Sequence, residues 1–262
     1  MAKIFFLGTA SGVPTENRYC GSTLVSINRD LYLLDGGEPC SASLVRANID
    51  YNRIRSIFIS HMHVDHFGGI PLLIQVMQLK GKCGQRKSDL KLFVPHEGIS
   101  GIKEYLKALY LVDELLPFKL KIISIKDNPV YRDNNLKIYT HTNKHLGWWE
   151  KETIAKKYPK LRGSSYSFVI QAKGKKIVYS GDIKEVHELE PLMEKADLLI
   201  LEMAHVLPEE IFKFLADKAV AKIVCNHIHP DWNDKDDEYQ KLGQEHLGKR
   251  FCIAYDGMEI DI

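Results

Sequence analysis

The sequence has little of what marks secreted, membrane-spanning or disordered proteins. Its five cysteines lie far apart and form no CxxC pair, which argues against a disulfide framework or a cysteine-rich zinc module. The apolar run near the N-terminus is too short for a signal-peptide core, and the longest apolar stretches, such as residues 70–77, are far shorter than a membrane span. These absences predict a cytoplasmic protein with no membrane partner.

The sequence also has no excess of positive or negative charge. Lys and Arg total 36 against 34 Asp and Glu, so the formal charge of +2 gives no strong overall attraction to nucleic acid or acidic lipid. A composition of 45% hydrophobic and 27% charged residues excludes a disordered chain. There is no repeat, low-complexity segment or Pro/Ser-rich linker. We therefore expect one domain over residues 1–262.

Alternating strand and helix patterns run along the chain. Strands are predicted at 3–7, 22–27, 31–34, 54–60, 91–94, 119–125, 136–142, 166–172, 176–180, 198–202 and 222–225, with a closing strand pair within 251–262. Helices are predicted at 70–80, 98–111, 185–195, 208–218 and 236–247. This order favours an α/β sandwich with the sheets inside and the helices outside.

Three histidines and one aspartate fall within six residues after the predicted strand 54–60. His61 and His63 would point to the same side of an extended backbone, because strand side chains alternate. The chain then turns, so Asp65 and His66 can face a neighbouring point from the other side. This spacing predicts a site for two divalent cations. Imidazole and carboxylate ligands suit Zn²⁺, with Mn²⁺ or Fe²⁺ as chemical alternatives.

Five segments carry a family resemblance: Phe6–Thr15, Leu33–Gly37, His61–Pro71, Ser180–Asp182 and Ala254–Met258. On these segments the chain resembles the metallo-β-lactamase superfamily, and most closely its ribonuclease Z-like branch of tRNA 3′-processing enzymes and related phosphodiesterases. The resemblance implies an αββα four-layer sandwich with a metal site at one edge between the sheets. It also implies a possible homodimer.

The resemblance implies three further metal ligands. One histidine should lie between the signature loop and a bridging aspartate, Asp182. His145 is preferred because it follows the strand 136–142, and His141 is the alternative. The last ligand should follow a late strand, where His227 is preferred and His229 is the alternative. The predicted metal ligands are therefore His61, His63, Asp65, His66, His145, Asp182 and His227.

The predicted reaction is metal-dependent hydrolysis, and the resemblance favours phosphodiester bonds. Two cations lower the pKa of a shared water, and Asp65 orients that water and accepts its proton. His205 is the candidate donor to the leaving oxygen; its alternative is an ordinary loop residue. The substrate would be RNA, cut by an endonuclease, or a small cyclic or nucleotide ester. A carboxylic ester, thioester, lactone or amide is the alternative substrate class, and a non-catalytic binding module is the second alternative.

Some segments depart from tRNA-processing enzymes. Their late strand carries a His-Glu-Ala-Thr type motif, of which only Glu202 matches in residues 201–205, and no His-Ser-Thr motif follows. Their Gly/Pro-rich tRNA-binding arm is absent, and the insert over 148–162 is compact. It holds Trp148 and Trp149, which would stack on a base or pack the lid of the cleft, and a basic segment, 156–162, which would hold phosphates or be a solvated turn.

Overall fold

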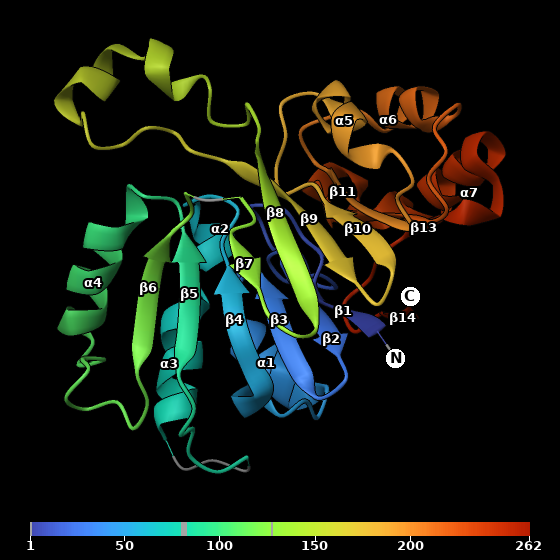
Figure 1. Cartoon of the computed structure of the whole chain (residues 1–262). Helices are drawn as coiled ribbons and strands as arrows, with labels where there is room; N and C mark the ends of the chain where they lie inside the picture. The colour runs from blue at the N-terminus through green and yellow to red at the C-terminus, as the bar shows by residue number, and fades with distance from the viewer. Residues whose placement is uncertain (1, 80–82, 127) are drawn as a thin grey trace.

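Two seven-stranded sheets face each other and carry helices on both outer faces (Figure 1). This computed structural model describes residues 2–79, 83–126 and 128–262. The first sheet has the strand order β14-β1-β2-β3-β4-β5-β6, and the second has the order β13-β12-β11-β10-β9-β8-β7. The predicted αββα four-layer sandwich is confirmed.

The first sheet is built almost entirely from the first half of the chain. Its strands are β1 (Ala2–Gly8), β2 (Ser22–Ile27), β3 (Asp30–Leu34), β4 (Ile54–Phe58), β5 (Leu90–Val94), β6 (Leu120–Ser124) and β14 (Glu259–Asp261). The second sheet consists of β7 (Tyr131–Arg132), β8 (Leu136–Thr142), β9 (Tyr166–Ala172), β10 (Lys175–Tyr179), β11 (Leu198–Met203), β12 (Ile223–Ile228) and β13 (Phe251–Ile253). β14 returns the C-terminus beside β1, so the two ends of the chain lie together (Figure 1).

The helices divide between the two sheets in chain order. The first sheet is followed or covered by α1 (Cys40–Arg46), α2 (Val64–Phe67), α3 (Ile70–Gln78) and α4 (Gly98–Ala108); the second by α5 (Glu190–Met193), α6 (Pro208–Leu215) and α7 (Asp236–Leu247). Short 3₁₀ helices are η1 (Tyr51–Arg53), η2 (Trp149–Lys151), η3 (Thr153–Lys157), η4 (Val186–Leu189), η5 (Pro230–Lys235) and η6 (Gly248–Arg250). No helix within the described ranges is long and apolar enough to cross a membrane.

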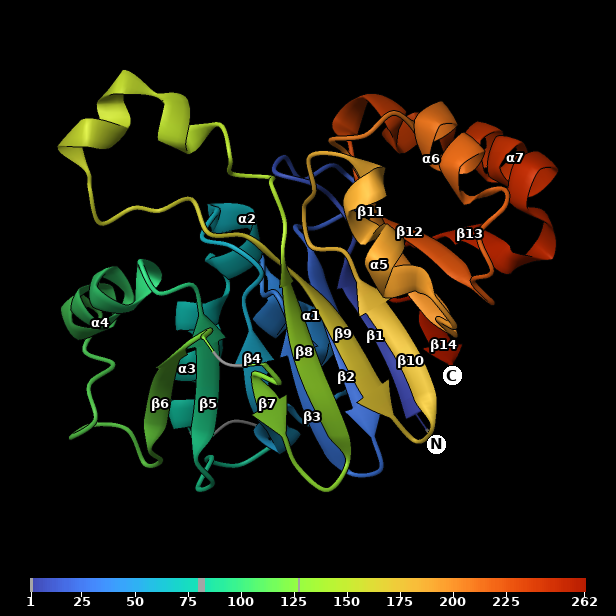
Figure 2. The same cartoon turned by 45° about the horizontal axis from the view of Figure 1, so that its top comes forward.

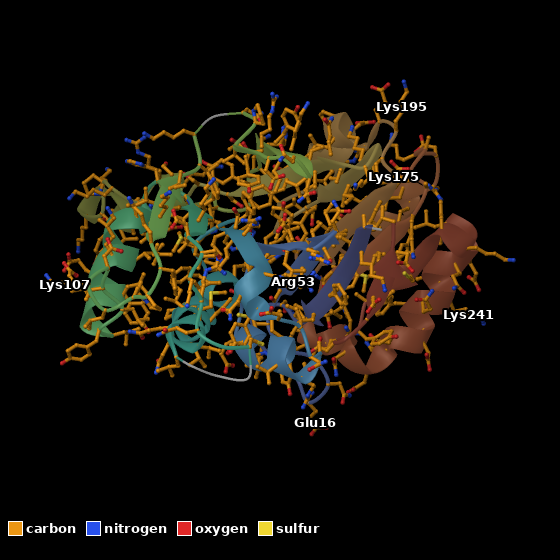
Figure 3. All side chains as sticks on the ribbon, turned by 60° about the horizontal axis from the view of Figure 1, so that its bottom comes forward. Glu16, Arg53, Lys107, Lys175, Lys195 and Lys241 are labelled. Carbon is orange, nitrogen blue, oxygen red and sulfur yellow. The ribbon has the colours of Figure 1, made fainter. Side chains whose placement is uncertain are left out.

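Three apolar clusters hold the layers together. One lies between the sheets, where Phe58 of the first sheet contacts Phe168 of the second edge to face, with ring centroids 6.1 Å apart. A second cluster joins the first sheet to α1, α3 and α4, and a third joins the second sheet to α6 and α7. Figure 3 shows the side chains that fill these layers, with Lys107, Lys195 and Lys241 at the outer edge of the molecule. This arrangement leaves the strand ends free to carry polar side chains.

Two predictions of secondary structure were wrong, one was too long, and some short elements were missed. The closing strands do not pair with each other: β13 pairs with β12 and β14 pairs with β1, so they belong to different sheets. The helix expected over 185–195 is divided into η4 and α5, because Pro191 has no N–H to donate to a carbonyl one turn earlier. The helix α1 was not predicted. The helix expected over 70–80 ends at Gln78, and its last predicted residue, Lys80, lies outside the described residues.

Candidate metal centre

The first sheet delivers four polar side chains to one end of the sandwich. β4 ends at Phe58, and the chain continues through His61 and His63 into the short helix α2, which carries Asp65 and His66. The loop that follows β3 must lie very close to α2, because a Cβ on Gly37 would come 2.1 Å from the Asp65 carbonyl oxygen. Glycine at position 37 is therefore needed for the two loops to meet.

The second sheet delivers its side chains to the same end. His145 follows β8, Asp182 follows β10, and His227 is the fifth residue of β12. His227 has a φ of +55°, a left-handed conformation that is uncommon for histidine. The register between β11 and β12 shifts at the neighbouring residues, Glu202 and Met203. Backbone strain of this kind is retained where the surrounding structure needs the side chain in one direction.

These side chains form two groups suited to metal ions. The first group is His61, His63, His145 and Asp182, and the second is Asp65, His66, Asp182 and His227. Within each group, one ligand atom from every residue lies within 4.8 Å of the others. Asp182 belongs to both groups, so its two oxygens can bridge two cations.

Unpaired buried atoms indicate what the centre would hold. Among the described residues, the Nε2 atoms of His61, His66 and His227 and the Oδ1 atom of Asp182 are buried without a hydrogen-bond partner. Buried polar atoms normally have partners, so an unpaired set calls for an explanation such as an ion. The residues present therefore fit divalent cations bound by nitrogen and oxygen ligands.

Burial keeps the imidazoles of the first group ready to coordinate. It lowers the pKa of His61 well below the usual range, and it lowers the pKa of His63. The pKa of His145 falls to about 4, mainly through burial. Neutral imidazoles have a free lone pair near neutral pH, which is the form that binds metals.

Charge dominates the second group. Burial opposes the charged form of Asp182, but His227 and His66 hold its pKa well below the usual range. Burial also opposes the charged form of His66, yet the carboxylates of Asp182 and Asp35 raise its pKa well above 6.5. The carboxylates of Asp182 and Asp65 in this group together supply the negative charge that a cation site requires.

Asp35 positions His66 from behind. Its Oδ2 accepts hydrogen bonds from His66 Nδ1, Ser60 Oγ and Tyr179 Oη, each at 2.8 Å, and its Oδ1 accepts from the Ser60 backbone N–H at 2.7 Å. The bond from Nδ1 leaves Nε2 of His66 facing the centre. Asp35 lies in one of the segments that carried the resemblance, but its role was not predicted from the sequence. The available signal was only its place directly after an apolar strand and before Gly36 and Gly37.

Glu202 positions His205 in a similar way. His205 Nδ1 lies 3.1 Å from Glu202 Oε1 and 3.8 Å from Asp182 Oδ2. Burial lowers the pKa of His205, but the hydrogen bond and charge of Glu202 outweigh it and raise the pKa to about 8. His205 is therefore a charged donor at the edge of the centre near neutral pH.

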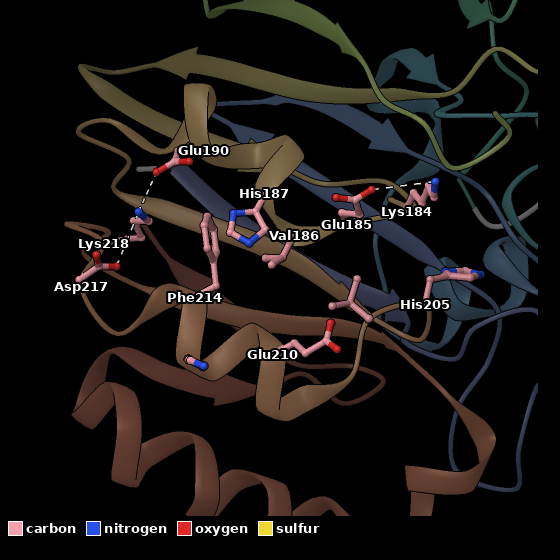
Figure 4. A pocket seen from close by; sticks show the side chains of 12 residues that line it. Lys184, Glu185, Val186, His187, Glu190, His205, Glu210, Phe214, Asp217 and Lys218 are labelled. Carbon is pink, nitrogen blue, oxygen red and sulfur yellow. Dashed lines mark hydrogen bonds and ion pairs between the residues drawn. The ribbon is translucent and has the colours of Figure 1, made fainter.

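A cavity of about 560 Å³ opens beside His205. Its walls come from η4, α6 and the residues next to them, and they carry both acidic and basic side chains, including Lys184, Glu185 and Glu210 (Figure 4). His205 lies at its border, with the ring directed away from the pair formed by His187 and Phe214 (Figure 4). The cavity therefore gives access from the surface to the His205 side of the metal centre.

The structure brings together all seven residues predicted as ligands. The two alternatives lie elsewhere: His141 sits within β8, in register with Ser167, and His229 caps η5, where its Nδ1 accepts the Asp231 N–H. Neither belongs to the two ligand groups found among the described residues. Asp182 does not cap the helix after it, because Glu185 forms the capping box with Glu188.

Comparisons with known proteins agree with this geometry. The family model described as Anti-Pycsar protein Apyc1 matches residues 2–246. A protein named ribonuclease Z from Methanosarcina acetivorans is 27% identical over 310 aligned positions, which cover 100% of this chain and 98% of that protein.

Among solved structures, the metallo-β-lactamase fold protein YhfI from Bacillus subtilis matches with a TM-score of 0.79 and 18% identity, covering 99% of this chain and 98% of that one. The short form of human tRNase Z matches with a TM-score of 0.73 and 20% identity, covering 99% of each chain. The resemblance to the ribonuclease Z-like branch of the metallo-β-lactamase superfamily is confirmed. Within that fold, the match over residues 2–246 shows that the chain belongs to the Anti-Pycsar protein Apyc1 family.

Proposed function

We propose that this protein is a metal-dependent hydrolase of phosphodiesters that uses two divalent cations. The observation that carries the proposal is the pair of four-residue ligand groups that share Asp182. The relatives named ribonuclease Z support the phosphodiester as substrate class. Zn²⁺ is the cation that suits this mixture of imidazole and carboxylate best, with Mn²⁺ and Fe²⁺ as alternatives.

Cations held by these residues would make a water acidic and neutralise the charge of the phosphodiester. Asp65 is suited to orient that water and to accept its proton. Its pKa is lowered, because the hydrogen bond and charge of His66 outweigh its partial burial, so it is an ionised acceptor. His205 is suited to protonate the leaving oxygen, because Glu202 keeps it charged and binds its Nδ1, which leaves Nε2 for the substrate.

A small phosphodiester, cyclic or a nucleotide ester, is the substrate we favour. The segment between β8 and β9 contains only the short helices η2 and η3, and it extends from the ends of these strands above α2 and toward α4 (Figure 2). It lacks the glycine- and proline-rich arm implied for tRNA binding. A compact insert of this kind can border a small substrate more readily than it can hold a folded RNA.

RNA is the second candidate, because the same insert is basic. Residues 151–162 carry Lys151, Lys156, Lys157, Lys160 and Arg162 against one described acidic side chain, that of Glu152. Such a segment next to the centre would attract a phosphate backbone.

We also propose a homodimer in the cytoplasm. All five cysteines are free thiols, which is in keeping with a reducing compartment. Tyr105, Leu109, Tyr110 and Leu115 form an exposed apolar surface on α4 and the loop after it, which would suit contact with a second copy. Light scattering would measure the mass.

Elemental analysis combined with a substrate panel tests the function. We expect close to two equivalents of metal per chain and hydrolysis of a cyclic nucleotide and a nitrophenyl phosphodiester. His63→Ala should lose both hydrolytic activities and about one equivalent of metal. His229→Ala is the matched control and should keep both. Cleavage of precursor tRNA alone would favour the RNA candidate, and turnover limited to lactones, thioesters or β-lactams would contradict the proposal. A metal-replete protein inert toward every ester would indicate a binding module.

A further inference from the structure

A second, smaller cavity adjoins the metal centre at His63. We call it the aromatic cavity. It has a volume of about 220 Å³ and is lined by Met62, His63, Glu97, Leu146, Trp148, Trp149, Leu161 and Gly163. Pockets that enclose drug-sized ligands measure roughly 300–1,000 Å³. The aromatic cavity therefore suits a single ring system rather than a larger ligand.

The walls of the aromatic cavity are fixed by the insert itself. The indole N–H of Trp149 donates to the Leu161 carbonyl at 2.9 Å, which ties the two limbs of the insert together. Gly163, at φ +64°, lets the returning chain pass so close that a Cβ would lie 2.8 Å from the Leu146 carbonyl oxygen and 3.3 Å from the Trp149 Cβ. The Trp148 and Trp149 rings meet edge to face, with centroids 5.9 Å apart and an interplanar angle of 83°.

Trp148 is a lining residue whose side chain is partly open to solvent. Its side chain is 51% exposed, although it contacts Trp149 and lines the cavity. A large apolar ring is costly to leave in water, and burying one contributes to binding when a flat partner covers it. The fixed Trp149 and the open Trp148 therefore make a surface on which one planar group can stack.

The aromatic cavity is continuous with the metal centre through His63. His63 lines the cavity and also belongs to the first ligand group, where its Nδ1 lies 3.4 Å from His145 Nε2. Met62, the neighbour of His63, packs against the first turn of α4, because a Cβ on Gly98 would come 2.5 Å from its sulfur. A ring bound in the cavity would therefore lie within reach of a phosphodiester at the metal centre, to which it could be attached.

The polar side chains that line the aromatic cavity indicate which kind of ring it can bind. None of the described residues that line it is Lys or Arg, so the wall offers no partner for a second phosphate. Glu97 is the one carboxylate, and its oxygens accept hydrogen bonds from the Ser164 N–H at 2.7 Å and the Ser164 hydroxyl at 2.9 Å. Each oxygen keeps a lone pair that can accept an N–H from a ligand.

We propose that the aromatic cavity binds the nucleobase of the substrate, stacked on Trp148, while its phosphodiester lies at the ligand groups. The assignment to a substrate depends on the proposed hydrolase function, but binding of the base does not. The base would be an uncharged nitrogen heterocycle with an N–H edge, and stacking would tolerate different bases, because every base has a flat apolar face.

Steady-state kinetics with a matched pair of substrates tests the proposal. The pair is a nucleoside 3′,5′-cyclic phosphate and the same ribose cyclic phosphate without a base. Trp148→Ala should raise KM for the cyclic nucleotide on the order of 10-fold with little change in kcat, since loss of one base stack has an effect of about that size. KM for the abasic substrate should stay constant, and Trp148→Phe should restore most of the loss.

Tyr255→Ala is the control, because Tyr255 is 61% exposed and does not line the aromatic cavity. It should leave KM unchanged for both substrates. Equal effects of Trp148→Ala on the two substrates, or no effect on either, would overturn the nucleobase assignment while leaving phosphodiester hydrolysis intact.

A binding measurement separates this inference from the proposed function. We expect a nucleoside 5′-monophosphate to quench the tryptophan fluorescence of the wild-type protein and of Trp232→Phe, and to quench Trp148→Phe much less. Quenching without hydrolysis of any ester would support the aromatic cavity and contradict the hydrolase. Quenching that persists in full in Trp148→Phe would contradict the aromatic cavity.

Discussion

The pair formed by Glu202 and His205 leads to a prediction about the pH dependence of the reaction. Glu202→Gln removes the charge that raises the pKa of His205 from 6.5 to about 8. A proton donor must be protonated, so its contribution is present below its pKa and is lost as pH rises through it. The variant should therefore lose activity on the basic side at lower pH than the wild type.

The size of the effect follows from the two pKa values. At pH 7.5, a group with a pKa of about 8 is about three-quarters protonated, whereas one at 6.5 is about one-tenth protonated. We therefore expect kcat/KM at pH 7.5 to fall about eightfold or more in Glu202→Gln, and the basic limb to move to pH 6.5 or below, because burial still lowers the pKa of His205 when Glu202 is uncharged. The effect should be largest for an alkyl phosphodiester, because a nitrophenolate leaves readily without a proton.

The assay is kcat/KM measured from pH 6 to 9 with saturating metal, on a nitrophenyl and an alkyl ester in parallel. His229→Gln is the control: its side chain is as exposed as that of His205, 40%, but lies outside the ligand groups, so its basic limb should stay that of the wild type. Thermal melting checks the fold of Glu202→Gln, because Glu202 also accepts the Ala204 and His205 backbone N–H groups. An unchanged basic limb for the alkyl ester in a folded Glu202→Gln protein would refute the role assigned to His205.

Three further predictions concern the metal centre and the loops around it. Asp182→Asn should lower metal content by close to two equivalents and His63→Ala by close to one, as measured by elemental analysis, because Asp182 belongs to both ligand groups; equal losses would contradict the bridging role. Asp35→Asn should weaken metal binding about 10- to 100-fold in competition with a chelating dye, because His66 loses the charged acceptor that orients it, and unchanged affinity would show that the charge of Asp35 is not needed. Gly37→Ala should lower the melting temperature, because its Cβ would lie 2.1 Å from a backbone oxygen, whereas Gly101→Ala on α4, with open space around it, should not; equal melting temperatures would contradict the close approach of the two loops.

Features that depend on neighbouring residues could be predicted from the sequence. The four side chains from His61 to His66 lie on one short segment, and their division between the two ligand groups follows from the alternation of an extended backbone and the turn after it. His145 was preferred over His141 because it follows the end of a strand, and that boundary, at Thr142, is where the structure places it.

Features that depend on which distant segment a strand or side chain contacts could not be predicted in the same way. β13 and β14 are three residues each, too short for a local pattern to indicate that they join opposite sheets. Asp35 gives no sign in the sequence that His66, Ser60 and Tyr179 will surround it, because Tyr179 belongs to the other sheet. The family resemblance supplied the long-range information that pattern alone lacks.

The ligands come from both halves of the chain, and this has a consequence for how the molecule unfolds. His61, His63, Asp65 and His66 come from the half of the chain that builds the first sheet, and His145, Asp182 and His227 come from the half that builds the second. A cation coordinated by both sets would link the two halves, since it binds only when both halves are folded against each other. The melting temperature should then rise with the concentration of free metal. A chelator should weaken the packing of the two sheets against each other before it changes the strand pairing within either sheet.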